Sequence, residues 1–146
     1  MELPDLAATA QLGARIAAAL QPGDVVTLSG GLGAGKTTLA RAILAALGHQ
    51  GEVPSPSFTI IELYDELTMR LPVVHADFYR LADPSEATEL GLDEYRAGGV
   101  LIAEWPERVG GFDDEPGCLA ITLKPAGERR LAQITLGAVW AERLPL

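Results

Sequence analysis

The sequence contains no apolar run that approaches the roughly 20 residues of a membrane span, so we expect no transmembrane helix and no membrane partner. The opening Met1–Asp5 is acidic and has no basic segment, which argues against a secretory signal peptide. The single cysteine, Cys118, cannot form an internal disulfide, and a reducing compartment suits it. These absences predict a cytoplasmic protein.

Basic residues are scarce. Lysine occurs only at Lys36 and Lys124, and the formal net charge is −9. The arginines are scattered, with Arg129 and Arg130 as the one adjacent pair. A protein that grips nucleic acid with its own surface carries a basic stripe. We therefore expect no unaided binding of this chain to RNA or DNA.

The run Gly30–Thr37, GGLGAGKT, fits the phosphate-binding pattern G-x-x-x-x-G-K-[ST]. The β-branched segment 25–28 precedes it and the Ala- and Leu-rich segment 38–47 follows it, which predicts strand, loop and helix. Glycines let backbone N–H groups curl around phosphate oxygens, and the helix N-terminus favours an anion. Lys36 is then expected to reach the β- and γ-phosphates, and the Thr37 hydroxyl to bind Mg²⁺. The alternative is a glycine-rich turn with an incidental Lys-Thr pair.

The 146 residues fit one domain, 1–146, with a core that needs no disulfides. The patterns predict helices over 4–20 and from Asp83 to near Gly91, a short turn over 92–96, and strands over 58–64, 73–77, 100–104, 119–123 and 131–136. The last two strands alternate and favour an antiparallel pair at a sheet edge, whereas 100–104 is typical of a buried parallel strand. We predict an α/β P-loop NTPase fold: three αβα layers around a mixed, mainly parallel sheet with antiparallel C-terminal edge strands.

Two carboxylates end apolar strands, Asp77 after 73–76 and Glu104 after 100–103. P-loop enzymes need a second acidic group for Mg²⁺, and ligands of open α/β folds bind at such strand ends. One carboxylate would hold the metal with Thr37, and the other would orient or deprotonate the attacking water. Ordinary charged strand ends are the alternative for each.

Three further features are ambiguous from the residues alone. The segment Ser55–Thr59 stands where a GTPase has its first switch loop, so Thr59 would sense the γ-phosphate and metal, or the segment is simply a proline-rich loop. His75 shares a strand face with Asp77, although a lone histidine is more often structural. Trp105 caps a pocket, faces a partner or belongs to the core. The histidines and the cysteine show no zinc spacing, so we predict no structural metal.

Taken in order, these blocks resemble the TsaE family, also called YjeE. The P-loop alone indicates only a nucleoside triphosphate, whereas the ordered set at these spacings is specific and spans nearly the whole chain. The matching blocks are Leu3-Pro4-Asp5 with Thr9, Gly33-Ala34-Gly35-Lys36-Thr37-Thr38, Ser55–Thr59, His75–Leu81, and Glu104-Trp105-Pro106.

The resemblance implies a compact P-loop sheet with an unusual strand arrangement. It also implies a weak ATPase that is activated in a complex with the partners TsaD and TsaB. TsaD transfers the threonylcarbamoyl group to the adenosine beside the tRNA anticodon, and ATP hydrolysis would reset this machinery between turnovers. This chain would meet tRNA only through the complex.

By the same resemblance, Thr37 and Glu104 would ligate Mg²⁺, Lys36 would bind phosphate, and Asp77 would assist the water. The further expected contacts of ATP are Thr9 near the adenine, Gly33, Ala34, Gly35, Thr38, Thr59 and Trp105. Trp105 would lie near the site or a partner surface. Gly31 departs from the family, because many relatives have Asp there.

Other functions are weighed against the same residues. A small-molecule kinase would need an acceptor site and an arginine-bearing lid, for which Arg129 and Arg130 are the one candidate pair in a short chain. A GTPase would need an N/TKxD guanine clamp, and neither lysine lies in one. A non-catalytic, nucleotide-gated interaction module would keep Lys36 and Thr37 and yet fail to turn over ATP.

Overall fold

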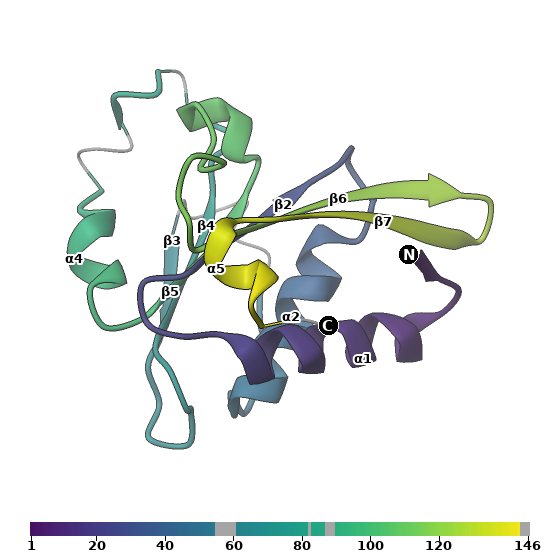
Figure 1. The fold of residues 1–146 in the computed structure, drawn as a ribbon, viewed down its shortest axis with the longest axis horizontal. Helices are drawn as coiled ribbons and strands as arrows, with labels where there is room; N and C mark the ends of the chain where they lie inside the picture. The colour runs from purple at the N-terminus through teal and green to yellow at the C-terminus, as the bar shows by residue number, and fades with distance from the viewer. Residues whose placement is uncertain (55–60, 82, 87–89, 144–146) are drawn as a thin grey trace.

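The computed structural model describes residues 1–54, 61–81, 83–86 and 90–143 (Figure 1). Its helices and strands alternate along most of the chain. In chain order they are β1 (Glu2–Leu3), α1 (Leu6–Ala19), β2 (Val25–Ser29), α2 (Lys36–Leu47), β3 (Ile61–Tyr64), β4 (Val73–Asp77), α4 (Leu92–Arg96), β5 (Val100–Glu104), the 3-10 helix η1 (Pro106–Val109), β6 (Cys118–Ala126), β7 (Arg129–Leu136) and α5 (Ala138–Ala141). Within these ranges no helix is long and apolar enough to cross a bilayer.

The strands form one seven-stranded sheet in the order β1-β7-β6-β2-β5-β4-β3. The four inner strands β6, β2, β5 and β4 are parallel, whereas β7, β3 and β1 pair antiparallel with their neighbours. This confirms the predicted mixed, mainly parallel sheet with an antiparallel C-terminal pair towards one edge. The outermost strand on that side is the two-residue β1, which is too short to show any periodicity in the sequence. In Figure 1 the N-terminus lies beside the far end of the β6–β7 hairpin.

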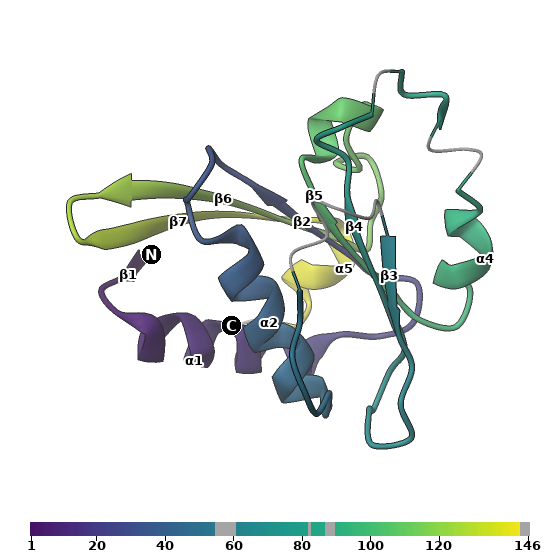
Figure 2. The same ribbon diagram turned by 180° about the vertical axis from the view of Figure 1, so that it is seen from behind.

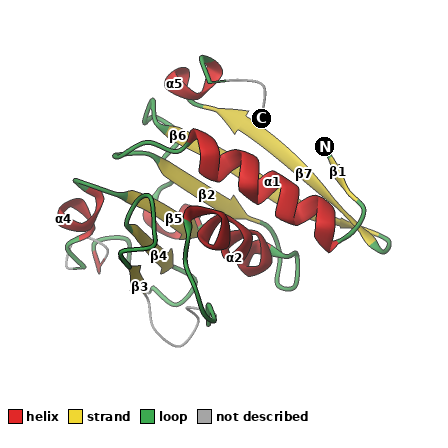
Figure 3. Cartoon of the chain, turned by 90° about the horizontal axis from the view of Figure 1, so that it is seen from below, coloured by secondary structure: helices red, strands yellow, loops and turns green. Residues whose placement is uncertain are grey.

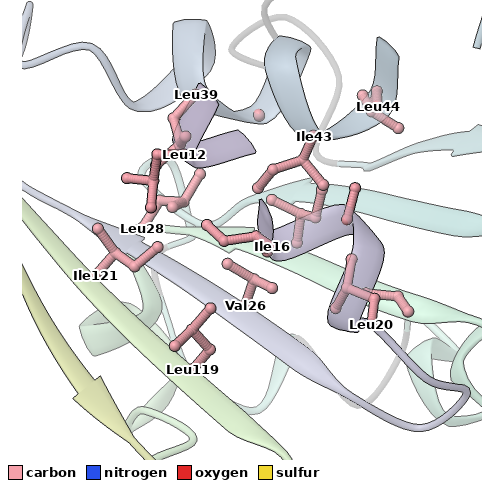
Figure 4. Packing of buried hydrophobic residues seen from close by; sticks show 14 of the residues in the cluster. Leu12, Ile16, Leu20, Val26, Leu28, Leu39, Ile43, Leu44, Leu119 and Ile121 are labelled. Atoms are coloured by element: carbon pink, nitrogen blue, oxygen red, sulfur yellow. The ribbon is translucent and has the colours of Figure 1, made fainter. Parts of the chain in front are cut away.

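Helices α1 and α2 lie side by side over one face of the sheet (Figures 2 and 3). They pack tightly at Gly13, where an added Cβ would lie 2.5 Å from the Cβ of Ala42. Figure 4 shows side chains of both helices meeting those of β2 and β6 in the main core. Its labelled members are Leu12, Ile16, Leu20, Val26, Leu28, Leu39, Ile43, Leu44, Leu119 and Ile121.

A smaller apolar cluster covers the opposite face. Val74 of β4 and Leu101 of β5 pack there with Phe78 and with Leu92 of α4. Every residue of β4 and β5 is buried, as expected for parallel strands covered on both sides. The two clusters give the predicted three layers, with the second helical layer represented by short elements.

Element boundaries differ from the sequence prediction for local reasons. The first helix begins at Leu6 because Asp5 is its N-cap, and the Asp5 side chain accepts a 2.8 Å hydrogen bond from the Ala8 N–H. Of the strand predicted over 58–64, the described part is Ile61–Tyr64. Asp83 accepts a 2.9 Å hydrogen bond from the Ser85 N–H at the start of the segment predicted to be helical, and residues 87–89 of that segment lie outside the described residues.

Candidate functional site

The glycine loop joins β2 to α2 and depends on backbone conformations that only glycine adopts easily. Gly30, Gly33 and Gly35 all have positive φ, and Gly35 is the N-cap of α2. A Cβ on Gly30 would lie 2.4 Å from the Leu123 carbonyl oxygen. Gly31 has no such constraint, because a Cβ there meets nothing within 4 Å. An aspartate at this position, which the resemblance led us to expect, is therefore not excluded by space.

Lys36 is the first residue of α2 and is only 6% exposed. Its Nζ donates hydrogen bonds to the carbonyls of Gly30, at 2.8 Å, and Gly31, at 2.9 Å. The ammonium also lies 4.5 Å from the centre of the Trp105 ring. Burial lowers the pKa of Lys36, and the charge of Glu104 opposes that shift. The ammonium of Lys36 is thus held against its own loop by uncharged carbonyl groups. A phosphate oxygen would be a stronger hydrogen-bond acceptor than either carbonyl.

Glu104 lies at the end of β5, 3% exposed, between two partners. The Thr37 hydroxyl donates to its carboxylate, with Oγ1 3.2 Å from Oε1 and 3.3 Å from Oε2. His75 approaches from β4, and its Nε2 lies 2.6 Å from Glu104 Oε2. His75 therefore holds the Glu104 carboxylate in place in addition to filling the core. The sequence alone did not distinguish a site role from a purely structural one for this histidine.

The protonation of His75 follows from its surroundings. The ring is fully buried, and its Nδ1 has no hydrogen-bond partner among the described residues. A carboxylate oxygen accepts hydrogen bonds, so the 2.6 Å contact with Glu104 Oε2 makes Nε2 the ring nitrogen that carries a proton and donates it to that carboxylate.

Asp77 ends β4 directly beside Glu104 in the parallel register of β4 and β5. The carboxylate is 8% exposed and accepts a 2.9 Å hydrogen bond from the Tyr79 N–H. Burial raises the pKa of Asp77, and the neighbouring charge of Glu104 raises it further, against the Tyr79 hydrogen bond that lowers it. The structure thus brings both predicted carboxylates to the same end of the sheet as the glycine loop.

One cleft of about 480 Å³ collects most of the predicted site residues. It is lined by Leu32, Gly33, Ala34, Gly35, Lys36, Thr37, Thr38, Asp77, Tyr79, Arg80, Glu104, Trp105 and Arg130. Thr9 lies in an adjoining pocket of about 180 Å³ that shares Ala34, Gly35, Thr38 and Arg130 with the cleft. Thr59, the predicted γ-phosphate sensor, lies outside the described residues.

Trp105 lines this cleft and is only partly buried, which excludes the core position among the three that the sequence allowed for its side chain. Among the described residues it is the one non-glycine with positive φ, at 57°, a strained conformation typical of functional sites. Its ring is 4.8 Å from that of Tyr79, over which Arg108 lies at 5.4 Å. Sequence reasoning did not select Tyr79 or Arg130 as site residues.

A family model and individual relatives all match this chain under the same family name. The family model "Threonylcarbamoyl adenosine biosynthesis protein TsaE" matches residues 3–132. A protein of Bacillus subtilis called tRNA threonylcarbamoyladenosine biosynthesis protein TsaE is 51% identical over 90 residues, which are 61% of this chain and 54% of that protein. Its Streptomyces coelicolor namesake is 45% identical over 98 residues, 66% of each chain. The chain thus aligns with just over half to two thirds of the length of these two relatives.

The fold has a similar solved structure. The crystal structure of Bacillus subtilis YdiB superposes with a TM-score of 0.79 at 34% sequence identity, covering 98% of this chain and 88% of that one. The similarity in three dimensions therefore includes the segments beyond the sequence alignments above.

Proposed function

The chain belongs to the TsaE family of threonylcarbamoyl adenosine biosynthesis proteins, and from this premise we propose that it is a Mg²⁺-dependent ATPase acting in the threonylcarbamoyladenosine modification of tRNA. One observation carries the enzymatic part of the proposal. Lys36, Thr37, Asp77 and Glu104 line a single cleft although they come from three separate elements. Nucleotide hydrolysis needs a cationic side chain that binds the phosphates, oxygen ligands for the metal, and a carboxylate that acts on the attacking water.

The donor set fits magnesium. Glu104 and Thr37 offer hard oxygen ligands, which Mg²⁺ prefers. Their oxygens are 3.2–3.3 Å apart, and neighbouring ligands of an octahedral Mg²⁺ at about 2.1 Å are separated by about 3 Å. Bound Mg²⁺ would neutralise charge that develops on the phosphates. His75 would keep the Glu104 carboxylate in place, and the Thr37 hydroxyl oxygen would offer a lone pair to the metal.

Asp77 is suited to act on water. The Tyr79 N–H fixes one carboxylate oxygen and leaves the other for the attacking water. Its raised pKa brings the group closer to the range in which a carboxylate accepts a proton efficiently. Asp77 thus orients the water and takes its proton, while Glu104 is committed to Thr37 and His75.

The pocket that contains Thr9 is our candidate for the base. It adjoins the glycine loop through Ala34, Gly35 and Thr38, and its lining includes apolar atoms of Leu3 and Leu123. A flat, weakly polar ring such as adenine suits such a pocket. Within the family proposal, Thr59 senses the γ-phosphate, and Trp105 reports nucleotide or partner binding.

The partners we propose are subunits of the TsaD and TsaB type, in the cytoplasm. The net charge of −9 disfavours direct RNA contact, so tRNA would be held by those subunits. ATP-dependent association is expected because a γ-phosphate with its metal can order a loop that a partner recognises. In this proposal, hydrolysis resets the threonylcarbamoyl-transfer complex.

The deciding experiment is ATP hydrolysis by the chain alone and with cognate TsaD and TsaB, using Lys36→Ala as the matched inactive control. We expect weak turnover alone and faster turnover in the complex. ATP binding without turnover in either case would favour the nucleotide-gated interaction module. Phosphate transfer to a small-molecule acceptor would favour the kinase. Tight, salt-sensitive tRNA binding by the isolated chain would contradict the delegated RNA contact.

A further inference from the structure

Arg130 reaches the glycine loop from a distant part of the chain. It belongs to β7, where it lies opposite Pro125 of β6 and Leu3 of β1. Its Nε donates to the Ala34 carbonyl at 3.2 Å, and its Nη2 donates to the Gly33 carbonyl at 3.4 Å. One guanidinium therefore holds two consecutive peptide units of the loop.

Holding these carbonyls also fixes two N–H groups. In a planar trans peptide the C=O and the following N–H point in opposite directions. The carbonyls of Gly33 and Ala34 are joined in this way to the N–H groups of Ala34 and Gly35. The Ala34 N–H accordingly points across the loop, to the Gly31 oxygen at 3.2 Å. Arg130 thus fixes both peptide units: the Ala34 N–H closes the loop on Gly31, and the Gly35 N–H points away from the guanidinium.

The charge distribution at this point also calls for an anion. Arg130 lies 3.8 Å from the position of a Cβ on Gly35, the N-cap of α2, so its cation stands at the positive end of that helix dipole. Lys36 adds a second cation in the same turn. None of the ion pairs among the described residues involves Arg130, which donates instead to the backbone oxygens of Gly33, Ala34 and Arg129. A negatively charged ligand would offset this accumulation of positive charge.

We propose that Arg130 is a positioning residue for the phosphate-binding loop: it holds the Gly33 and Ala34 carbonyls, so that the Ala34 N–H closes the loop on Gly31 and the Gly35 N–H faces the phosphates of a nucleotide. This inference rests on the proposed function, because it concerns the phosphate side of the same site. It assigns Arg130 to the nucleotide site, which takes away one of the two adjacent arginines that the kinase alternative would use.

The neighbouring residue supplies a matched control. Arg129 points to the other side of β7, since successive strand residues alternate faces. Its Nη1 pairs with Glu2 Oε2 at 3.2 Å, and its side chain is 59% exposed. Arg129→Ala therefore removes the same charge from the same strand without touching the loop.

The test is ADP and adenosine binding to the isolated full chain, followed by NMR of backbone amides, for wild type, Arg130→Ala, Arg130→Lys and Arg129→Ala. We expect Arg130→Ala to weaken ADP binding roughly tenfold, the effect of one to two hydrogen bonds. Adenosine binding, which lacks phosphates, should change less than about twofold on the same scale. Arg130→Lys should behave like Arg130→Ala, because one ammonium cannot replace the planar fork. Arg129→Ala should match wild type.

The Ala34 and Gly35 amide resonances give a readout that general destabilisation would not move selectively. They should shift in both Arg130 variants before any ligand is added, and ADP should perturb them less than in wild type. Unchanged ADP affinity, full rescue by Arg130→Lys, or equal losses for ADP and adenosine would each overturn the inference. Wild-type protein that fails to bind ADP would instead overturn the proposed function.

Discussion

Replacing His75 tests whether the Glu104 carboxylate, which we propose to bind Mg²⁺, depends on a buried donor. His75 Nε2 lies 2.6 Å from Glu104 Oε2, and both side chains are almost fully buried. His75→Leu keeps the volume roughly constant but removes the donor. A hydrogen bond to a charged group contributes about 1.5–3 kcal/mol, so we expect the free energy of unfolding to fall by about that amount. The unfolded fraction would rise roughly 10- to 150-fold.

Two amide variants separate donation from packing. Gln places its amide nitrogen near the position of imidazole Nε2, whereas Asn places it near Nδ1, away from Glu104. His75→Gln should therefore recover a good part of the lost stability, and His75→Asn should resemble His75→Leu. In a Glu104→Gln background, His75→Leu should cost less, because the buried partner is then neutral.

The assays are urea unfolding followed by circular dichroism, and the Mg²⁺ concentration at half-maximal ATP hydrolysis. Under the proposed function, His75→Leu and His75→Asn should need more Mg²⁺ than wild type, since the Glu104 carboxylate is no longer held. His75→Gln should need less Mg²⁺ than either. Equal stability of wild type and His75→Leu, or no advantage of Gln over Asn, would refute the reasoning.

Four further predictions address the remaining groups. Lys36→Ala should weaken ATP binding by about 1.5–3 kcal/mol and abolish measurable turnover, so wild-type hydrolysis rates in that variant would refute the site. Glu104→Gln should raise the Mg²⁺ requirement, whereas Asp77→Asn should lower kcat with nucleotide affinity nearly intact; the opposite pattern in steady-state kinetics would reverse the two roles. Competition between ATP and GTP should favour ATP. Folding raises the pKa of Asp77, so ionisation of this group lowers the free energy of unfolding as pH rises above its ordinary pKa of 3.8. In urea unfolding without ligand, Asp77→Asn should therefore be more stable than wild type at pH 7. The difference should vanish below pH 3.8.

Much of the site was predictable because its chemistry is local in the sequence. The glycine loop encodes its own conformation, and the apolar strands that end in Asp77 and Glu104 predicted where those carboxylates meet. Which of the two carboxylates binds the metal and which acts on water was assigned only through the family resemblance. The four elements that build the phosphate side, namely β2, α2, β4 and β5, were all expected near their observed bounds.

What could not be predicted comes from long-range pairing. Arg130 meets Gly33 and Ala34 across 97 and 96 residues, respectively, and only the adjacent arginine pair distinguished it in the sequence. The two-residue β1 is held by β7 and not by its own propensity. The contact between His75 and Glu104 needs the registry of β4 beside β5, which is set by packing over both strands.

The same site concentrates features that oppose folding in the absence of a ligand. Burial disfavours the charge of both Asp77 and Lys36, and Trp105 holds a left-handed backbone conformation. Arg130 stands at a helix N-terminus where a cation is unfavourable. Away from the site, charges are placed conventionally, as where Arg143 pairs with the buried Asp24. A phosphate chain with a divalent cation would offset the unfavourable charges of Asp77, Lys36 and Arg130 together. The phosphates supply anions for the two basic groups, and the metal supplies a cation for the carboxylate. Nucleotide with Mg²⁺ should therefore stabilise this fold far more than either component alone.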